Sequence, residues 1–142
     1  MPVRNAHAQW EGTLQDGKGQ MAFGSGAFEG AYSFASRFEE GTGTNPEELI
    51  AAAHAGCFSM AFAGALGRNG FDPKRVSTTA KVHIERVDQG FKITKSVLST
   101  EAEVPGIDQA KFTEIAEGAK ANCPVSQALA GVDISLEAKL LS

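Results

Sequence analysis

A long stretch without charge is the feature that most constrains how this chain folds. From Leu49 to Gly67 there is no charged side chain while His54 is neutral. The residues before it signal a helix start, because Asn45 suits the N-cap position and Pro46 suits the first helical position. The sequence therefore predicts one long helix that is apolar on all sides.

A helix that is apolar all round lies either deep in a core or in lipid. This one approaches the length of a membrane span, but glycines, His54 and Ser59 interrupt it and no aromatic belt flanks it. We interpret it as a core helix and expect no membrane association. Because a chain of 142 residues has few elements with which to wrap such a helix, a second copy is expected to cover it, which predicts a homodimer.

The remaining elements are short and of mixed type. Alternation of apolar and polar side chains predicts strands, and helical spacing predicts two further helices. The strands are expected near residues 8–14, 28–34, 76–87, from 91 onward and 134–140, and the helices near 112–119 and from Pro124 onward. This order of elements indicates an α+β fold, formed as one domain over residues 1–142.

Charge and cysteine content argue against several functions. The formal net charge is −4 and the pI is about 5.4, with no run of lysine or arginine, so nothing favours nucleic acid as a partner. The N-terminus lacks the basic and apolar segments of a secretory signal, which predicts a cytoplasmic protein. Two cysteines are too few for a disulfide scaffold, and in a reducing compartment any disulfide between them is expected to be transient.

The two cysteines, Cys57 and Cys123, occupy different local settings. Cys57 falls in the middle of the apolar helix, where a buried cysteine commonly serves as a small apolar side chain. Cys123 directly precedes Pro124, so its thiol is expected at the positive end of a short helix, a setting that favours a thiolate. In mid-helix, Cys57 would need a nearby cation to be activated.

Arg37 is the candidate for that cation, since it is expected to end a strand just before the glycine-rich approach to the long helix. Glu47, in the first turn of the helix, would hold its guanidinium by a two-pronged hydrogen bond. Each residue also has a simpler interpretation: Arg37 as a solvated surface arginine, and Glu47 as a favourable charge at a helix N-terminus.

His54 lies one turn before Cys57 and can share its helix face. A Cys–His dyad is one interpretation, and a packed histidine is the simpler one. A zinc site built from the cysteines and histidines lacks any paired-ligand spacing, and the glycines match no nucleotide fingerprint. We therefore expect neither a metal nor a cofactor.

Two cysteine motifs, each in a long matching context, resemble a known family. They are GTNPEELIAAAHAGCFSMA over residues 43–61 and ANCPVSQAL over 121–129, and the match extends to HAQWEG near the start, VPGID and the final strand. Over essentially the whole chain the sequence resembles the OsmC/Ohr family of hydroperoxide reductases, and its OsmC branch in particular. No functional position departs from the family pattern.

The resemblance implies roles that the residues alone leave open. It implies that Cys57 attacks the peroxide and Cys123 resolves the product, with Arg37 and Glu47 beside the reactive sulfur. It also implies antiparallel sheets around long buried helices, and an intertwined homodimer with two active sites at the subunit interface. The implied reaction is reduction of organic hydroperoxides, and less well of hydrogen peroxide, with a dithiol such as a lipoylated protein as reductant.

The apolar setting of the long helix also predicts a substrate pocket. Phe38, Phe58 and Phe62 are its candidate lining residues, although core packing is the simpler interpretation of each. Such a pocket would favour organic hydroperoxides over hydrogen peroxide. Two other functions fit the same features: a redox sensor that uses a Cys57–Cys123 disulfide to change partner binding, and a non-catalytic protein that binds an apolar ligand.

Overall fold

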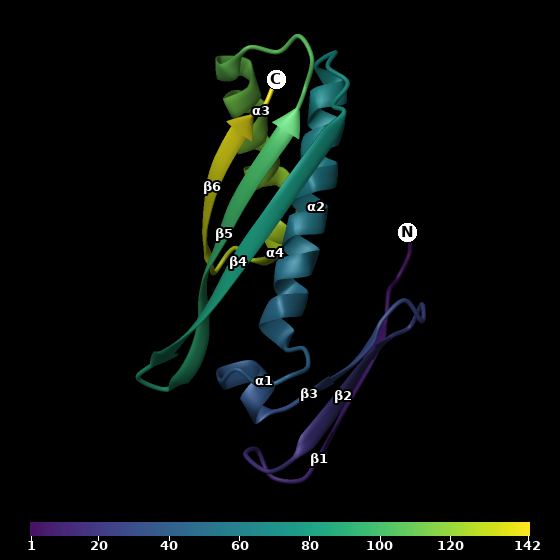
Figure 1. Cartoon of the computed structure of the whole chain (residues 1–142), viewed down its shortest axis with the longest axis vertical. Coiled ribbons are helices and arrows are strands. Elements are labelled where there is room, and N and C mark those ends of the chain that lie inside the picture. The colour runs from purple at the N-terminus through teal and green to yellow at the C-terminus, as the bar shows by residue number, and fades with distance from the viewer. The chain divides into compact units, whose positions relative to one another are not determined.

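The computed structural model describes all residues from Met1 to Ser142 and contains two compact units (Figure 1). The first unit spans Met1–Leu49 and the second spans Ile50–Ser142. Their elements combine strands and helices, which confirms the predicted α+β class. That both units belong to one domain stays a prediction.

The first unit contains a three-stranded antiparallel sheet and a short helix. Its strands, in spatial order, are β1 (Ala6–Glu11), β2 (Lys18–Phe23) and β3 (Glu29–Tyr32), and the helix is α1 (Phe34–Phe38). Gly19 of β2 pairs with Trp10 on one side and Tyr32 on the other, and a Cβ at this position would collide with both rings. Because Gly19 has no side chain, the two rings can meet, with 5.4 Å between their centroids.

Ser33 determines where α1 begins. Its hydroxyl accepts a hydrogen bond from the Ser36 N–H at 3.1 Å, and the Ser36 hydroxyl accepts one from the Ser33 N–H at 2.8 Å. This reciprocal capping box stabilises the first turn. It thereby sets the position of Arg37, which is the next residue along the helix, so the expectation that Arg37 ends a strand is wrong.

The second unit contains a three-stranded sheet and the helices that cover it. Strands β4 (Arg75–Val87) and β5 (Gly90–Glu103) form a long antiparallel hairpin, and β6 (Asp133–Leu140) pairs with β5 in parallel. This last pair is the exception to the expected antiparallel pairing. Between β5 and β6 the chain passes through α3 (Gln109–Asn122) and α4 (Pro124–Ala128), and parallel neighbours need such a long crossover, which is usually helical.

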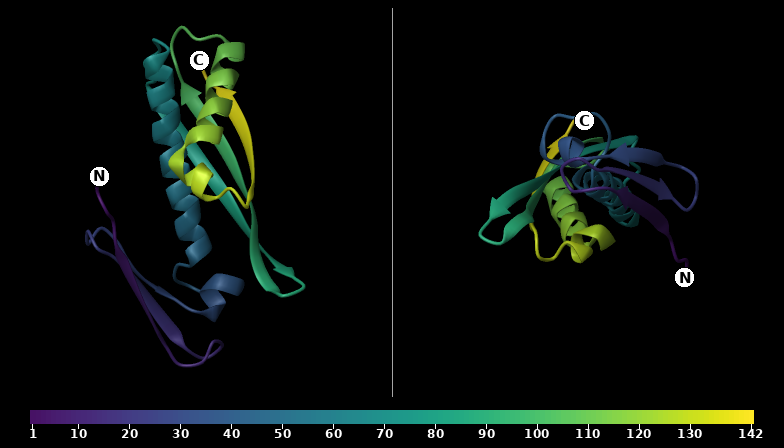
Figure 2. Two further views of the ribbon diagram at one scale, coloured as in Figure 1. Left: turned by 180° about the vertical axis from the view of Figure 1, so that it is seen from behind. Right: turned by 90° about the horizontal axis from the view of Figure 1, so that it is seen from below.

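Helices α2 (Pro46–Arg68) and α3 pack against β5 to form the core of the second unit (Figure 2). Aromatic rings meet at its centre, where the centroid of Phe62 lies 5.6 Å from that of Phe58 and 5.3 Å from that of Phe112. The fully buried apolar residues are Phe58, Phe62, Leu66, Leu98, Ala102, Val104, Phe112, Ala116 and Cys123. One of the two cysteines is therefore part of this core.

Helix α2 begins where the sequence predicts. Pro46 is its first residue, and the Glu48 N–H donates to the Asn45 side chain at 2.7 Å, as an N-cap requires. It is the one helix that is long and apolar enough to cross a membrane by length and composition alone. Every fourth residue along one face is nevertheless buried inside the protein, namely His54, Phe58, Phe62 and Leu66.

The opposite face of α2 is uncovered in the single chain. Gly56 and Gly64 are exposed, and Met60 between them is 80% exposed. One chain therefore covers only one face of this helix, as expected from its few elements, and its cover by a second copy stays a prediction.

Candidate active site

The two cysteines are neighbours in the second unit, on different elements. Cys57 projects from α2, and Cys123 is the N-cap of α4. Cys123 is fully buried, whereas Cys57 is only partly buried, although its place in mid-helix suggests a core residue. Successive helix residues are turned by about 100°, so Cys57 lies at the edge of the buried face that Phe58 occupies.

Helix α4 gives one backbone N–H to each sulfur. The Val125 N–H donates to Cys57 Sγ at 3.5 Å, and the Ser126 N–H donates to Cys123 Sγ at 3.4 Å. The sequence predicts this setting for Cys123 only, because the contact of Cys57 depends on how α2 and α4 pack. The first turn of α4 therefore joins both sulfurs in one site.

No cationic side chain hydrogen-bonds to Cys57 in this unit. Burial raises the pKa of its thiol, the Val125 N–H lowers it, and the neighbouring Cys123 thiol raises it. The net direction is upward. The second unit thus brings the two sulfurs together, but it favours the thiol form of Cys57 over the thiolate.

Arg37 and Glu47 form a two-pronged pair within the first unit, as the sequence predicts. Arg37 Nε donates to Glu47 Oε1 and Arg37 Nη2 donates to Glu47 Oε2, both at 3.0 Å. Glu47 is buried, whereas 36% of the Arg37 side chain is exposed. The guanidinium also lies over the Phe38 ring, 5.2 Å from its centroid. A buried carboxylate therefore holds a partly exposed guanidinium in one orientation.

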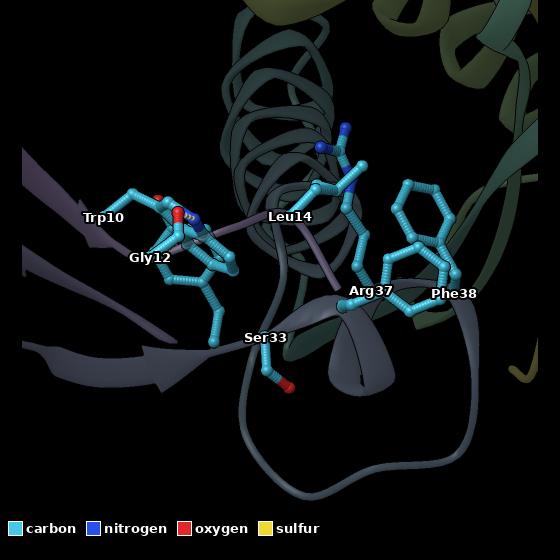
Figure 3. Close-up of a pocket in the computed structure, with 8 residues that line it drawn as sticks. Trp10, Gly12, Leu14, Ser33, Arg37 and Phe38 are labelled. Atoms are coloured by element: carbon cyan, nitrogen blue, oxygen red, sulfur yellow. Dashed lines mark hydrogen bonds between the residues drawn. The ribbon is translucent and has the colours of Figure 1, made fainter. Parts of the chain in front are cut away.

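Arg37 borders an apolar pocket of the first unit (Figure 3). The cavity has a volume of about 440 Å³ and is lined by Trp10, Gly12, Leu14, Tyr32, Ser33, Phe34, Arg37 and Phe38. Arg37 is the one charged residue among them. A pocket with one cation and a mostly aromatic and aliphatic lining suits a small molecule that has an apolar body and a polar end.

Of the three phenylalanines predicted to line a pocket, Phe38 does so and the other two do not. Phe58 and Phe62 are fully buried in the core of the second unit, so the core interpretation is the right one for them. The sequence analysis did not predict four apolar residues that line the pocket, namely Trp10, Leu14, Tyr32 and Phe34. The pairing register of the N-terminal strands would have indicated them, but the alternation of apolar and polar residues does not reveal that register.

His54 is fully buried, and both of its ring nitrogens have partners. Nδ1 lies 2.7 Å from Ser96 Oγ, and Nε2 lies 2.8 Å from Ser126 Oγ. Because both nitrogens are bound to serines, the dyad with Cys57 is wrong and the packed histidine is confirmed. Burial lowers the pKa of His54, which favours the neutral ring.

Comparison with known proteins identifies the family. The family model for OsmC-like protein matches residues 39–137. Peroxiredoxin OsmC of Escherichia coli (strain K12) is 49% identical over 140 residues, which cover 98% of this chain and 97% of that protein. An organic hydroperoxide resistance protein of Xanthomonas axonopodis pv. citri (strain 306) is 36% identical over 98 residues, which cover 68% of this chain and 67% of that protein.

A solved structure shows the same fold. The organic hydroperoxide resistance protein OhrB of Bacillus subtilis superposes with a TM-score of 0.72 at 26% identity, over 95% of this chain and 98% of that chain. The chain therefore belongs to the OsmC-like family. The predicted class, a peroxiredoxin-like enzyme, is confirmed by these relatives.

Proposed function

We propose that this protein reduces organic hydroperoxides to alcohols, with Cys57 as the attacking sulfur and Cys123 as the resolving sulfur. The observation that carries the proposal is the unequal burial of two adjacent thiols, since Cys57 is partly exposed and Cys123 is fully buried. A peroxide can reach the first thiol but not the second. Because both sulfurs accept N–H groups from one turn of α4, a product formed on Cys57 lies beside Cys123.

The proposed cycle has three steps. The Cys57 thiolate attacks the terminal oxygen of ROOH, the O–O bond breaks, and the departing alkoxide takes up a proton to become the alcohol. Cys57 is then a sulfenic acid, from which Cys123 displaces hydroxide, so that a disulfide and water form. A dithiol of lipoyl type exchanges with the disulfide and restores both thiols. The proposed setting is the cytoplasm, where thiol reductants are available.

Arg37, held by Glu47, is the proposed cation of the site. Making thiolate is the smaller part of its contribution. For a generic thiol, a fall in pKa from about 8.5 to about 6 raises the thiolate fraction at pH 7 roughly 30-fold, but lowers nucleophilicity roughly 13-fold. The net gain is only about twofold. The guanidinium is therefore proposed to act chiefly by orienting the peroxide and stabilising the departing alkoxide.

We further propose that the guanidinium reaches Cys57 from a second copy of the chain. Glu47 and Cys57 both belong to α2, and the ten-residue step between them is about 15 Å of helix. The exposed face around Met60 gives α2 an apolar surface on which a second copy would pack. An intertwined homodimer with shared active sites satisfies both observations.

Paired inactive variants test the shared site. Cys57→Ser and Arg37→Ala chains, each expected to be nearly inactive alone, are co-expressed with different tags and the mixed dimer is purified. If the sites are shared, the mixed dimer contains one intact site and has about half of the wild-type turnover. If the mixed dimer is inactive, or no dimer forms, the shared site is refuted.

Substrate choice and turnover test the function itself. With excess dithiol, kcat/KM for cumene hydroperoxide is expected to exceed that for hydrogen peroxide, because the pocket beside Arg37 is apolar. Equal or better use of hydrogen peroxide contradicts this role of the pocket. A disulfide that forms without turnover would instead indicate a redox sensor. A function that survives replacement of both cysteines by serine would indicate a binding protein.

A further inference from the structure

A chain of buried polar side chains leads away from Cys123. Its thiol donates to Ser126 Oγ, with 3.3 Å between the heavy atoms, and Ser126 Oγ lies 2.8 Å from His54 Nε2. On the other side of the ring, His54 Nδ1 lies 2.7 Å from Ser96 Oγ. These residues come from α4 and its N-cap, from α2 and from β5, and none is more than 5% exposed.

We propose that Ser126 and His54 form a proton relay that serves Cys123 when it resolves the sulfenic acid on Cys57. The inference rests on the peroxidase cycle proposed above and adds two residues to its second step. Ser126 touches the reacting thiol. His54 is a positioning residue that acts through Ser126.

Complete burial leaves the Cys123 thiol without solvent to take up its proton. The thiol must lose that proton to attack, because the thiolate is the nucleophile. Ser126 Oγ accepts a hydrogen bond from the Cys123 thiol and can therefore accept its proton. The Ser126 hydroxyl can pass its own proton to His54 Nε2, which lies within hydrogen-bond distance. Ser96 completes the arrangement, since an Nδ1–H donated to its oxygen leaves Nε2 free to accept.

The resolving step balances without an outside oxidant or reductant. The Cys123 proton moves to Ser126 Oγ as the Ser126 hydroxyl proton moves to His54 Nε2, and Cys123 Sγ forms a bond to Cys57 Sγ. The S–O bond of the sulfenic acid breaks, and its electron pair leaves with hydroxide. The proton held on His54 is then returned to this hydroxide, which becomes water.

The surroundings of His54 favour a neutral ring that can act as a base. Burial lowers its pKa, and its two hydrogen-bond partners are uncharged serines from β5 and α4. The titratable groups around it are Cys57, one turn later on α2, and Cys123, beyond Ser126. Glu47 lies two turns earlier on α2 and is bound to Arg37.

Rapid-quench kinetics time the two steps separately after one equivalent of cumene hydroperoxide is added to the reduced full-length protein. His54→Gln and Ser126→Ala are each expected to slow disulfide formation about 100-fold. Sulfenic acid formation, read in a Cys123→Ser background, should not change. Ser59→Ala is the matched control, because it removes a hydrogen bond of 2.8 Å from α2 to Thr78 of β4 that does not reach Cys123. It should leave both steps unchanged.

The pH profile distinguishes a relay from a packing role. In His54→Gln the attacking thiolate forms only by slow loss of the thiol proton to solvent, so disulfide formation should accelerate about tenfold per pH unit across the neutral pH range. The wild-type rate should stay flat over the same range.

Two outcomes would overturn the relay: an unchanged rate of disulfide formation, or a rate slowed equally at every pH. If His54→Gln does not fold, the same rate and pH measurements are made on Ser126→Ala, which leaves the His54 ring in place. They then decide whether the relay exists. A wild-type protein that forms no disulfide with peroxide would refute the peroxidase cycle itself, whereas normal wild-type cycling with fast resolution in both variants refutes only the relay.

Discussion

The unit Met1–Leu49 contains a cation and an apolar pocket but no cysteine, whereas the unit Ile50–Ser142 contains both cysteines. In the first, Glu47 orients Arg37 through two hydrogen bonds of 3.0 Å. In the second, burial and the neighbouring thiol raise the pKa of Cys57, and no cationic side chain bonds to it. Neither unit alone therefore contains all the residues of the active site proposed above.

The largest expected effect separates the two sulfurs of the second unit. Cys57→Ser should abolish peroxide reduction, because it removes the attacking sulfur. Cys123→Ser should reduce one equivalent of peroxide and then stall as a sulfenic acid on Cys57, because no thiol displaces the hydroxide. Single-turnover peroxide consumption, with mass spectrometry of the protein, measures both results. Activity in the Cys57→Ser protein would reverse the assignment.

Arg37→Ala tests what the first unit contributes. Its kcat/KM should fall about 100- to 1000-fold, as for loss of a donor that stabilises a developing oxyanion. Ultraviolet titration of Cys57 measures how much of this loss the thiolate fraction explains. Arg75→Ala is the matched control, because its partly exposed ion pair with Glu103, at 3.5 Å, lies in the second unit and includes no partner of either cysteine. If the thiolate fraction accounts for the whole loss, the proposed electrostatic role is wrong.

Leu14→Ala tests the pocket and should have a smaller effect. Leu14 is 64% exposed in the pocket lining, so an apolar substrate would cover it. Its removal should raise KM for cumene hydroperoxide about 5- to 25-fold, since full burial of a leucine contributes about 1.5–3 kcal/mol and 64% of Leu14 is left to be covered. Turnover of hydrogen peroxide, which has no apolar part, should not change. Leu141→Ala, at an exposed leucine of the second unit, serves as the control.

The smallest expected effect concerns stability and belongs to the second unit. Burial lowers the pKa of His54 from its ordinary value of 6.5, so just below that pH the unfolded chain binds a proton that the folded chain does not. Stability is thus complete above about pH 6.5 and is lost as the pH falls toward the lowered folded-state pKa. Urea denaturation should show a fall of up to about 1.4 kcal/mol per pH unit. In His54→Gln the free energy of unfolding should fall less steeply with pH than in the wild type. Equal slopes in the two proteins would show that His54 is not the group responsible.

Local signals predicted the start of α2 and the pairing of Arg37 with Glu47. The cap at Asn45 involves neighbouring residues, and only a short loop separates α1 from α2, so both features depend on nearby sequence. The roles of the two cysteines rest on motifs shared with a family. Local patterns did not predict that β6 lies parallel to β5, because strand direction depends on how the intervening helices cross over.

By itself, the sequence determined the class of fold, the family and the chemical groups available to the site, because these follow from periodicity, caps and motifs. Only the tertiary structure decided which thiol is buried, which rings line the pocket beside Arg37, and that His54 joins Ser96 to Ser126. These features depend on contacts between segments far apart in the chain. The uncharged stretch predicted a long helix, but the packing of its His54 and Phe58 face turned Cys57 to the edge, where its side chain is partly exposed.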